Sequence, residues 1–292
     1  MKIAIFGTKV TTDCTSKVEE ILHSFVASGF ELLIYKDFKK EIHSQSFSIS
    51  NIPEFSSLTK NDAEIIISLG GDGTFLQCAH LCYKTNIPIL GINFGKLGFL
   101  AQTNPDDIDN LIKNIKEKKY AIKQRSILDF SYSATPRKKV TGIGLNEITL
   151  QKSNAVKLIK INVYIKKEFF CSFWADGVAI STPTGSTGYS LSLGAPILSP
   201  ESKSVIITPI APHTLSIRPI IIPDSETIVL EASGEYTNFL ISNDYQSQTV
   251  QETKTTITIK KSKHKISIVE CPDTSFFKTL REKLKLGIDI RK

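Results

Sequence analysis

Residues 63–76 read Ala-Glu-Ile-Ile-Ile-Ser-Leu-Gly-Gly-Asp-Gly-Thr-Phe-Leu, "AEIIISLGGDGTFL". The first half is a continuous apolar run, which is typical of a strand buried on both faces of a parallel sheet. Three glycines and an aspartate, Asp72, follow it, and a helix is expected over residues 74–84. A glycine-rich turn between a strand and a helix brings backbone N–H groups close to a phosphate. We therefore predict a phosphate-binding loop made of Gly70, Gly71, Gly73 and Thr74.

This loop differs from the two best-known phosphate-binding motifs. No lysine follows its last glycine, so it is not a Walker loop, and its glycines do not match the pattern G-x-G-x-x-G. Residues 91–98, "GINFGKLG", come closer to a Walker loop, but one residue is missing between the glycines and a leucine follows the lysine. A tight turn with an aspartate cap would also explain residues 70–74, so the spacing alone leaves the role of Asp72 open.

Strand and helix signals alternate through the first part of the chain. "KIAIFG", "FELLIY" and "IPILGIN" are further apolar runs, and apolar residues recur at helical spacing over residues 16–29 and 105–118. This alternation predicts a Rossmann-like α/β domain with a parallel sheet over residues 1–125. In such sheets the ligand binds at the carboxyl ends of the strands, which is where residues 70–74 are expected.

The pattern changes after residue 125. "KLIKINVYI" alternates apolar and polar residues, and "ETIVLEA", "TNFLIS", "TTITIK" and "HKISIVE" are short β-branched runs separated by turn residues. We expect an all-β sandwich over residues 126–270. Helical spacing returns near the end of the chain, with Thr274 as the expected N-cap and Gly287 as the stop. The helical tail 271–292 is expected to pack back on the N-terminal domain.

Composition narrows the classes of function. The chain has 292 residues, of which 41% are hydrophobic and 22% are charged, and its formal net charge is +7. The apolar runs are too short to span a bilayer, and "MKIAIFG" resembles a first strand rather than a secretory signal, so we expect a cytoplasmic protein with no membrane contact. The basic residues are scattered and no nucleic-acid-binding motif accompanies them, so we expect no nucleic-acid partner. A positive chain suits polyanionic nucleotide substrates.

The cysteines favour a reducing compartment. There are five of them, an odd number, without the spacing of a disulfide framework. Cys78, His80 and Cys82 lie close together, but on a helix the two cysteines share a face while the histidine points elsewhere, and no second ligand pair follows. We therefore expect packed thiols and no metal site in the chain.

Two further stretches are rich in polar groups. Residues 181–190, within "ADGVAISTPTGSTGYS", hold six serine and threonine side chains and two glycines, which could supply many hydrogen bonds to a polar ligand. Alone, the segment would also fit a surface turn. Asn146 and Glu147, within "GIGLNEITL", are by default ordinary polar residues at a strand end.

Taken together, "GGDGT", "LNE" and "ADG…STPTGSTGYS", in this order and spacing, resemble the NAD kinase family. The likeness runs through nearly the whole chain, including "PHTLSIRPIIIP" (212–223) and "SNDYQ" (242–246). It implies transfer of a phosphoryl group from ATP, or in some members from polyphosphate, to the 2′-hydroxyl of the adenosine ribose of NAD, with Mg²⁺ or another divalent cation. It also implies a Rossmann-like domain, a β-sandwich that binds NAD, and a homo-oligomer, either a dimer or a tetramer.

The resemblance assigns a role to individual residues. Asp72 would accept the proton of the 2′-hydroxyl, Gly73 would let the dinucleotide approach, Asn146 and Glu147 would bind the adenosine ribose, and Asp176 would recognise the nicotinamide end. The other residues that it assigns to NAD are Lys157, Thr187, Gly188, Tyr189, Ser190, Leu191, Ser192 and Gln246. The six consecutive residues 187–192 among these would line the adenine side.

Four positions depart from the family pattern. Gly188 stands where alanine is usual, Lys157 where many members have histidine, and Tyr245 where a small residue is usual. Trp174 stands where many bacterial members have arginine, so this position lacks the cation that the resemblance would place against a phosphate or an inhibitory product.

Two rival functions share part of this pattern. Diacylglycerol, sphingosine and 6-phosphofructo kinases also contain the first motif, but a lipid kinase needs an apolar acceptor channel, whereas residues 181–190 are strongly polar. A non-catalytic dinucleotide sensor could keep the pocket, but it would have no use for a base at Asp72. We therefore expect an ATP-dependent NAD kinase.

Overall fold

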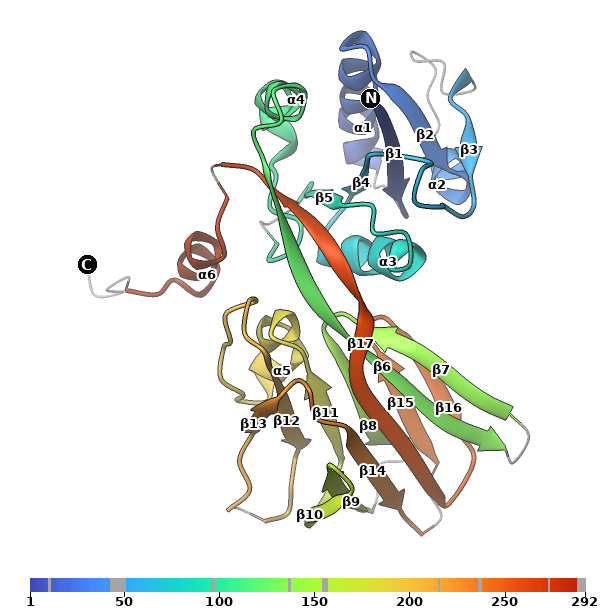
Figure 1. Cartoon of the computed structure of the whole chain (residues 1–292), viewed down its shortest axis with the longest axis vertical. Helices are drawn as coiled ribbons and strands as arrows, with labels where there is room; N and C mark the ends of the chain where they lie inside the picture. Colours follow the sequence, from blue (N-terminus) through green and yellow to red (C-terminus); the bar gives the residue numbers. More distant parts are fainter. Residues whose placement is uncertain are drawn as a thin grey trace. The chain divides into compact units, whose positions relative to one another are not determined.

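In a computed structural model the chain forms two compact units (Figure 1). The first consists of Met1–Gln124 and Ile266–Lys292, and the second of Arg125–Lys265. The structure describes residues 1–9, 12–42, 51–95, 98–135, 138–153, 157–214, 216–235, 238–272 and 274–287.

The first unit is built on a parallel sheet. Its strands lie in the order β17-β5-β4-β1-β2-β3, in which only the end of β17 comes from the C-terminal part of the chain. The strands are β1 (Lys2–Gly7), β2 (Glu31–Tyr35), β3 (Glu54–Phe55), β4 (Ile65–Leu69), β5 (Ile89–Ile92) and β17 (Lys254–Glu270). The central strands are buried along their whole length, as strands covered on both faces should be.

Helices cover both faces of this sheet. They are α1 (Thr12–Ala27), α2 (Lys36–Glu41), α3 (Asp72–Cys82) and α4 (Ile108–Lys116), which follows the single turn η2 (Pro105–Asp107). The last helix of the unit is α6 (Phe276–Leu284). The apolar side chains of α1 and α4 share a core with Leu90 and Ile92 of β5. Gly91 lies between these two in the strand and faces the ring of Phe75 on α3 instead. Because alternate residues of a strand face opposite sides, α3 covers the other face.

The second unit is a β-sandwich. One sheet has the order β13-β12-β11-β8-β15-β16, with antiparallel neighbours throughout, and the other contains β10, β9, β14, β17, β6 and β7. The bounds are β6 (Ala121–Thr135), β7 (Lys138–Gly144), β8 (Glu147–Lys152), β9 (Ile159–Ile165), β10 (Glu168–Ala175), β11 (Gly177–Ser181), β12 (Ser204–Ile210), β13 (Ile220–Pro223), β14 (Ile228–Ser233), β15 (Phe239–Asn243) and β16 (Gln246–Val250). Between β11 and β12 lie two short helices, η3 (Thr184–Thr187) and α5 (Tyr189–Ser192). Alternating apolar residues from both sheets form one buried core.

The fold class predicted from the sequence is confirmed: an α/β Rossmann-like unit, a β-sandwich and a terminal helix. Four local predictions were wrong. The helix after the glycine loop begins at Asp72 and not at residue 74. "TTITIK" and "HKISIVE" are parts of one continuous strand, β17, because the lysine-rich residues between them can stay extended with their charges in water. Both caps of α6 were misplaced: its N-cap is Ser275, whose side chain accepts the N–H of Lys278, and not Thr274, and its C-cap is Lys285 in the left-handed conformation, and not Gly287.

No helix in the part of the chain that the structure describes is long and apolar enough to cross a lipid bilayer.

Candidate active site

The glycine loop lies at the carboxyl edge of the parallel sheet. It leaves β4 at Gly70 and enters α3 with Gly71 as the N-cap. Gly70 has φ +145°, and a Cβ there would collide with the side chain of Thr74, so the turn needs glycine at this position. The Thr74 hydroxyl lies 3.3 Å from that of Thr8, which follows β1. The loop is therefore held in place from its own helix and from the neighbouring strand.

The start of α3 offers hydrogen-bond donors. The N–H of Phe75 is already bonded to the carbonyl of Gly71 at 3.1 Å. The N–H groups of residues 72–74 precede it, and the first N–H groups of a helix have no partner within the helix. A Cβ added at Gly73 would meet no atom within 4 Å, so this part of the turn faces open space. Such an arrangement favours an anion, because both the free N–H groups and the helix dipole attract negative charge.

The carboxylate of Asp72 turns back onto the loop that follows β5. Its Oδ2 accepts the N–H of Phe99 at 2.8 Å, and its Oδ1 accepts the N–H groups of Leu100 and Ala101 at 3.0 and 2.9 Å. A Cβ at Gly98 would collide with this carboxylate. An ionised carboxyl group has about four acceptor positions, so one position on Oδ2 is left after these three bonds. Asp72 thus holds the loop and keeps an acceptor for a further donor.

The C-terminal helix supports this same loop. The ring of Phe99 lies 6.3 Å, centroid to centroid, from the ring of Phe276 on α6. The ammonium group of Lys283, also on α6, lies 4.7 Å from the centroid of Phe99, within the range of a cation–π interaction. The residue whose N–H binds Asp72 is therefore itself packed against α6.

In the second unit, a second aspartate organises the Asn146–Glu147 pair. Asp244 lies in the turn between β15 and β16 with φ +54°. Its Oδ2 accepts the N–H of Leu145 at 2.7 Å, and its Oδ1 accepts those of Asn146 and Glu147 at 2.8 and 3.1 Å. The N–H of Asp244 is bonded in return to the carbonyl of Glu147 at 3.2 Å. These bonds fix the backbone of the pair at the start of β8.

The hydroxyl-rich segment packs closely against this pair. The N–H of Thr182 is bonded to the carbonyl of Asn146, and its hydroxyl is bonded to the carbonyl of Leu145 at 2.5 Å. A Cβ at Gly185 would collide with the Asn146 backbone. A Cβ at Gly188 would lie 3.2 Å from Oε2 of Glu147 and 3.3 Å from Nδ2 of Asn146. The glycines of the segment therefore permit its close approach to both side chains.

Not every hydroxyl in the segment is exposed for a ligand. The Ser190 hydroxyl is buried 3.3 Å from that of Thr208 on β12, and the Thr187 hydroxyl bonds to the carbonyl of Thr184. Tyr189 is partly exposed, and its backbone N–H bonds to the Glu147 carboxyl group. Leu191 and Ser192 complete the short helix α5.

Several buried polar atoms at this end of the sandwich have no hydrogen-bond partner. Among the described residues of the second unit they include Oδ1 of Asn146, Oε2 of Glu147, Oγ of Ser181 and Oγ1 of Thr184. Ser181 is paired with Glu147 in the register of β11 and β8, so these residues are neighbours. A buried polar atom without a partner costs free energy, so a local group of them indicates a place that a polar ligand completes.

Glu147 is also electrostatically unusual. Burial, and then the nearby charge of Asp244, raise the pKa of its carboxyl group from 4.5 to about 8, although the N–H of Tyr189 acts in the opposite direction. A carboxyl group with a pKa near neutrality is typical of a functional site.

The structure brings together only part of the predicted NAD-binding set. Gln246 begins β16 beside Asn243, at the same end of the sandwich as Glu147. Asp176 lies at the opposite end of β11 and β8, where its carboxylate forms an ion pair of 2.6 Å with Lys152. Lys157 follows the same end of β8 and pairs with Glu235 at 3.0 Å.

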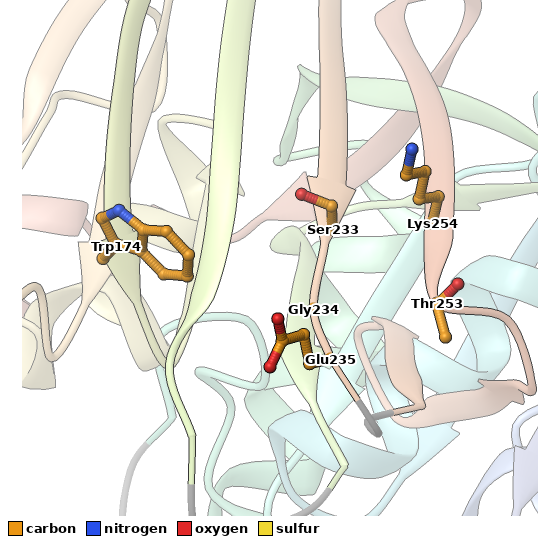
Figure 2. Close-up of a pocket in the computed structure, with 6 residues that line it drawn as sticks. All are labelled: Trp174, Ser233, Gly234, Glu235, Thr253 and Lys254. Atoms are coloured by element: carbon orange, nitrogen blue, oxygen red, sulfur yellow. The ribbon is translucent and has the colours of Figure 1, made fainter.

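A cleft of about 550 Å³ lies in the second unit (Figure 2). Its lining residues are Trp174, Ser233, Gly234, Glu235, Thr253 and Lys254. One of these lining residues, Glu235, is the partner of Lys157. Figure 2 shows the indole of Trp174 on one side and the Lys254 side chain on the other. Trp174 comes two residues before Asp176, so this cleft belongs to the end of the sandwich that does not carry Glu147.

Sequence reasoning missed Asp244 and the backbone N–H groups of Phe99, Leu100 and Ala101. The signal for Asp244 was an aspartate before a tyrosine between two strand runs, a position where an aspartate readily adopts positive φ. The role of residues 99–101 could not be found from sequence, because every residue except proline has a backbone N–H group and such a donor leaves no signature in the sequence.

Within the described part of the chain, no group of three or more His, Cys, Asp or Glu side chains could hold a metal ion. Cys78 and Cys82 are both buried on α3, and burial, followed by the contact with Cys82, raises the pKa of the Cys78 thiol well above its usual value. Buried neutral thiols of this kind behave as small apolar side chains.

Two family models match the chain. The model described as the ATP-NAD kinase N-terminal domain matches residues 9–120, and that described as the ATP-NAD kinase C-terminal domain matches residues 145–271. Among curated relatives, the NAD kinase of Flavobacterium psychrophilum is 41% identical over 295 residues, covering 100% of both chains. The NAD kinase of Bacteroides fragilis is 36% identical over 291 residues, again covering 100% of both.

Solved structures give a similar picture. The crystal structure of yeast NADH kinase complexed with NADH matches with a TM-score of 0.87 and 25% identity, covering 100% of this chain and 89% of that one. An NAD kinase from Archaeoglobus fulgidus in complex with ATP matches in fold, with a TM-score of 0.72 and 24% identity, covering 98% of this chain and 99% of that one.

Proposed function

The chain belongs to the NAD kinase family, and we propose that it transfers the γ-phosphoryl group of ATP to the 2′-hydroxyl of the adenosine ribose of NAD, with Asp72 as the proton acceptor. The observation that carries the role of Asp72 is its place at the start of α3. Its carboxylate lies beside N–H groups suited to phosphate and keeps an acceptor position on Oδ2. A hydroxyl bound at that position would donate its proton as it attacks phosphorus.

Most of the barrier in phosphoryl transfer is overcome by positioning and by neutralisation of charge. In this proposal the N–H groups of Gly73 and Thr74 hold phosphate oxygens, while the conformations of Gly70 and Gly71 shape the turn. ATP binds together with Mg²⁺ or another divalent cation, whose charge offsets that of the phosphates. Mg²⁺ is commonly held by one or two carboxylates together with the phosphates of the substrate, so this ion would bind with ATP.

The acceptor is bound by the second unit. Asn146 and Glu147 take the adenosine ribose, because Oδ1 and Oε2 are buried without partners. Gln246 lies at the same end of the sandwich, and Asp176 and Lys157 contact the nicotinamide part from the opposite end. The adenine side is formed by Thr187, Gly188, Tyr189, Ser190, Leu191 and Ser192. Ser190 contributes there through its packing against Thr208.

We also propose that the protein is a cytoplasmic homo-oligomer, a dimer or a tetramer, with NAD and ATP as its ligands and with neither nucleic acid nor membrane as a partner. Support for self-association comes from β10, the edge strand of its sheet, which exposes Phe169, Phe170 and Trp174. Exposed aromatic side chains along an unpaired strand edge favour contact with another chain.

The role of Asp72 is tested by Asp72→Asn, with Asp62→Asn as the matched control. Asp62 lies in the same unit, and its carboxylate also accepts hydrogen bonds, from the N–H and hydroxyl of Thr59 at 2.6 and 2.9 Å. We expect Asp72→Asn to lower kcat by ~10²–10⁴-fold with a KM for NAD within a few-fold, because the loss falls on the transition state. Asp62→Asn should change stability alone. An Asp72→Asn enzyme that retains most of its kcat would exclude Asp72 as the base.

A further inference from the structure

Glu147 sits in surroundings that oppose a negative charge. Its Oε2 is buried and has no hydrogen-bond partner. Three backbone N–H groups lie close by, at residues 145–147, but all of them donate to Asp244, so they stabilise the neighbouring carboxylate instead. Among the interactions that the structure describes, the only donor to the Glu147 carboxyl group is the N–H of Tyr189.

The groups packed around Glu147 supply no compensating cation. The turn between β15 and β16 contributes Asp244, which is repulsive, and Tyr245, whose pKa is raised chiefly by burial. The partner strand β11 places Ser181 opposite, and α5 contributes Tyr189. Within the described part of the chain, no lysine or arginine forms an ion pair with Glu147. A buried carboxyl group beside a like charge is stabilised by taking up a proton.

We propose that Glu147 binds the adenosine part of NAD as a neutral carboxylic acid, whose Oε2–H donates a hydrogen bond to an acceptor oxygen or ring nitrogen of the ligand. This inference rests on the proposed function and deepens it. Gly188 lies against both groups of the pair, since a Cβ there would lie 3.2 Å from Oε2 and 3.3 Å from Nδ2 of Asn146, so a larger residue at this position would crowd a ligand atom bound between them. Asn146 presents the complementary group, an unpartnered Oδ1 that can only accept. The pair would thus form hydrogen bonds with one acceptor and one donor of the same ligand.

Proton linkage distinguishes this proposal from binding by a carboxylate. The pKa of Glu147 is raised to about 8, so near pH 8 the free protein is a mixture of protonated and ionised forms. If the neutral acid binds NAD, binding takes up a proton and affinity falls as the pH rises above 8. If the carboxylate binds, a proton is released and affinity rises over the same range.

The experiment is calorimetric titration of the protein with NAD near pH 8, in two buffers of different ionisation enthalpy. We expect net proton uptake by the wild type and none by Glu147→Gln, which is neutral at every pH and keeps a donor in the same place. Glu147→Ala should bind NAD ~10-fold more weakly or worse, because it loses the donor. Glu252→Gln is the matched control, since Glu252 is exposed in the same unit and its substitution should leave proton uptake unchanged.

Proton release, or no proton exchange, with normal binding and phosphorylation of NAD would overturn the role of Glu147 and leave the proposed function standing. Failure of NAD to bind at all would instead count against the proposed function.

Stability gives a second measurement that needs no ligand. In the unfolded chain Glu147 should ionise near 4.5, whereas in the folded protein its pKa is about 8. Its contribution to stability is therefore complete below pH 4.5 and is lost progressively as the pH rises to about 8. We compare the unfolding free energy of Glu147→Gln with that of the wild type at pH 5 and at pH 9. The difference should favour the variant more at pH 9 than at pH 5. An equal difference at both pH values would contradict a buried neutral acid.

Discussion

Asp72 and Asp244 have the same structural task in the two units. Each carboxylate accepts three consecutive backbone N–H groups, at residues 99–101 and at residues 145–147. A short acidic side chain can do this because its two oxygens offer several acceptor positions within a small space. The segments so held lie beside the groups that we assign to catalysis and to ribose binding. A substitution at either aspartate therefore alters backbone order as well as charge.

We predict that Asp244→Asn lowers both stability and NAD affinity. Asparagine tolerates the positive φ of this position, so the backbone conformation is kept. It loses one acceptor oxygen and places an NH₂ group against N–H donors, which should cost about 1–3 kcal/mol of unfolding free energy. Urea denaturation measures the first effect and the KM for NAD the second. Values equal to those of the wild type in both assays would show that Asp244 does not organise the Asn146–Glu147 pair.

At this scale the sequence could identify a candidate residue by its chemical type, but it could not predict which other residues that side chain contacts. Asp72 stands out because an acid interrupts a glycine-rich turn, whereas Asn146 and Glu147 are ordinary polar residues by sequence and are singled out only by the resemblance to the family. The bond from Asp72 to the N–H of Phe99 joins residues 27 positions apart and depends on how two loops fold together. The raised pKa of Glu147 depends on burial and on Asp244, which is 97 positions away.

At the scale of elements, the glycine turn depends on its backbone conformation. We predict that Gly70→Ala destabilises the protein by about 1–3 kcal/mol, because φ is +145° and a Cβ would collide with Thr74. It should also lower kcat by about tenfold to a hundredfold through misplacement of Asp72. Gly29→Ala is the control, because Gly29 also has positive φ but no atom lies within 4 Å of its Cβ position. If both variants kept wild-type kcat, the geometry of this turn would not matter for turnover.

The C-terminal helix is predicted to support turnover through Phe99. Phe276→Ala should remove the ring that packs on Phe99, destabilise the protein by about 1–2 kcal/mol and lower kcat several-fold. Phe277→Ala is the matched control, since that ring is 70% exposed. Steady-state kinetics with thermal unfolding separate the two effects. Equal kcat values for both variants would mean that α6 does not order the loop at residues 99–101.

Elements were predicted best where one local rule decides them. The strands of the parallel sheet are continuous apolar runs, and α1 and α4 have clear helical spacing. The extent of β17 was misjudged because "KKSKHK" resembles a turn in composition, whereas the strand continues through it between the residues that pair with β14 and the residue that pairs with β5. The N-cap of α6 was misplaced by one residue because Thr274 and Ser275 are both good N-caps by type.

At the scale of the whole molecule, the two kinds of fold follow from the sequence, but the way in which the chain is divided between the two units does not. β6 and β17 each run from one unit into the other, and the described residues after the second crossing, up to residue 287, belong to the first unit. The sequence changes near residue 125 from alternating strand and helix patterns to short strand patterns, and this change marks the point where the chain first passes from one unit to the other. The return crossing lies inside a single strand, where no local composition change marks it.

The net charge of +7 leads to a prediction for the entire protein. We expect the KM for ATP to rise several-fold between about 0.01 M and about 0.15 M ionic strength, over which the Debye length falls from about 30 to about 8 Å. The kcat should change little, because interactions within a closed site are screened less. Initial-rate kinetics in a series of neutral salt concentrations measure both. A KM that is independent of salt would show that the overall charge does not assist nucleotide binding.

The most direct test of the central claim is the position of the phosphate in the product. The purified protein is incubated with NAD, ATP and Mg²⁺, and the product is analysed by mass spectrometry and by an NADP-specific dehydrogenase. NAD that lacks the adenosine 2′-hydroxyl serves as the control acceptor, and diacylglycerol and sphingosine serve as alternative acceptors. We predict one new phosphate, on the 2′-oxygen of NAD, and no product from the other three. Phosphate on another oxygen of NAD, or on a lipid, would contradict the assignment.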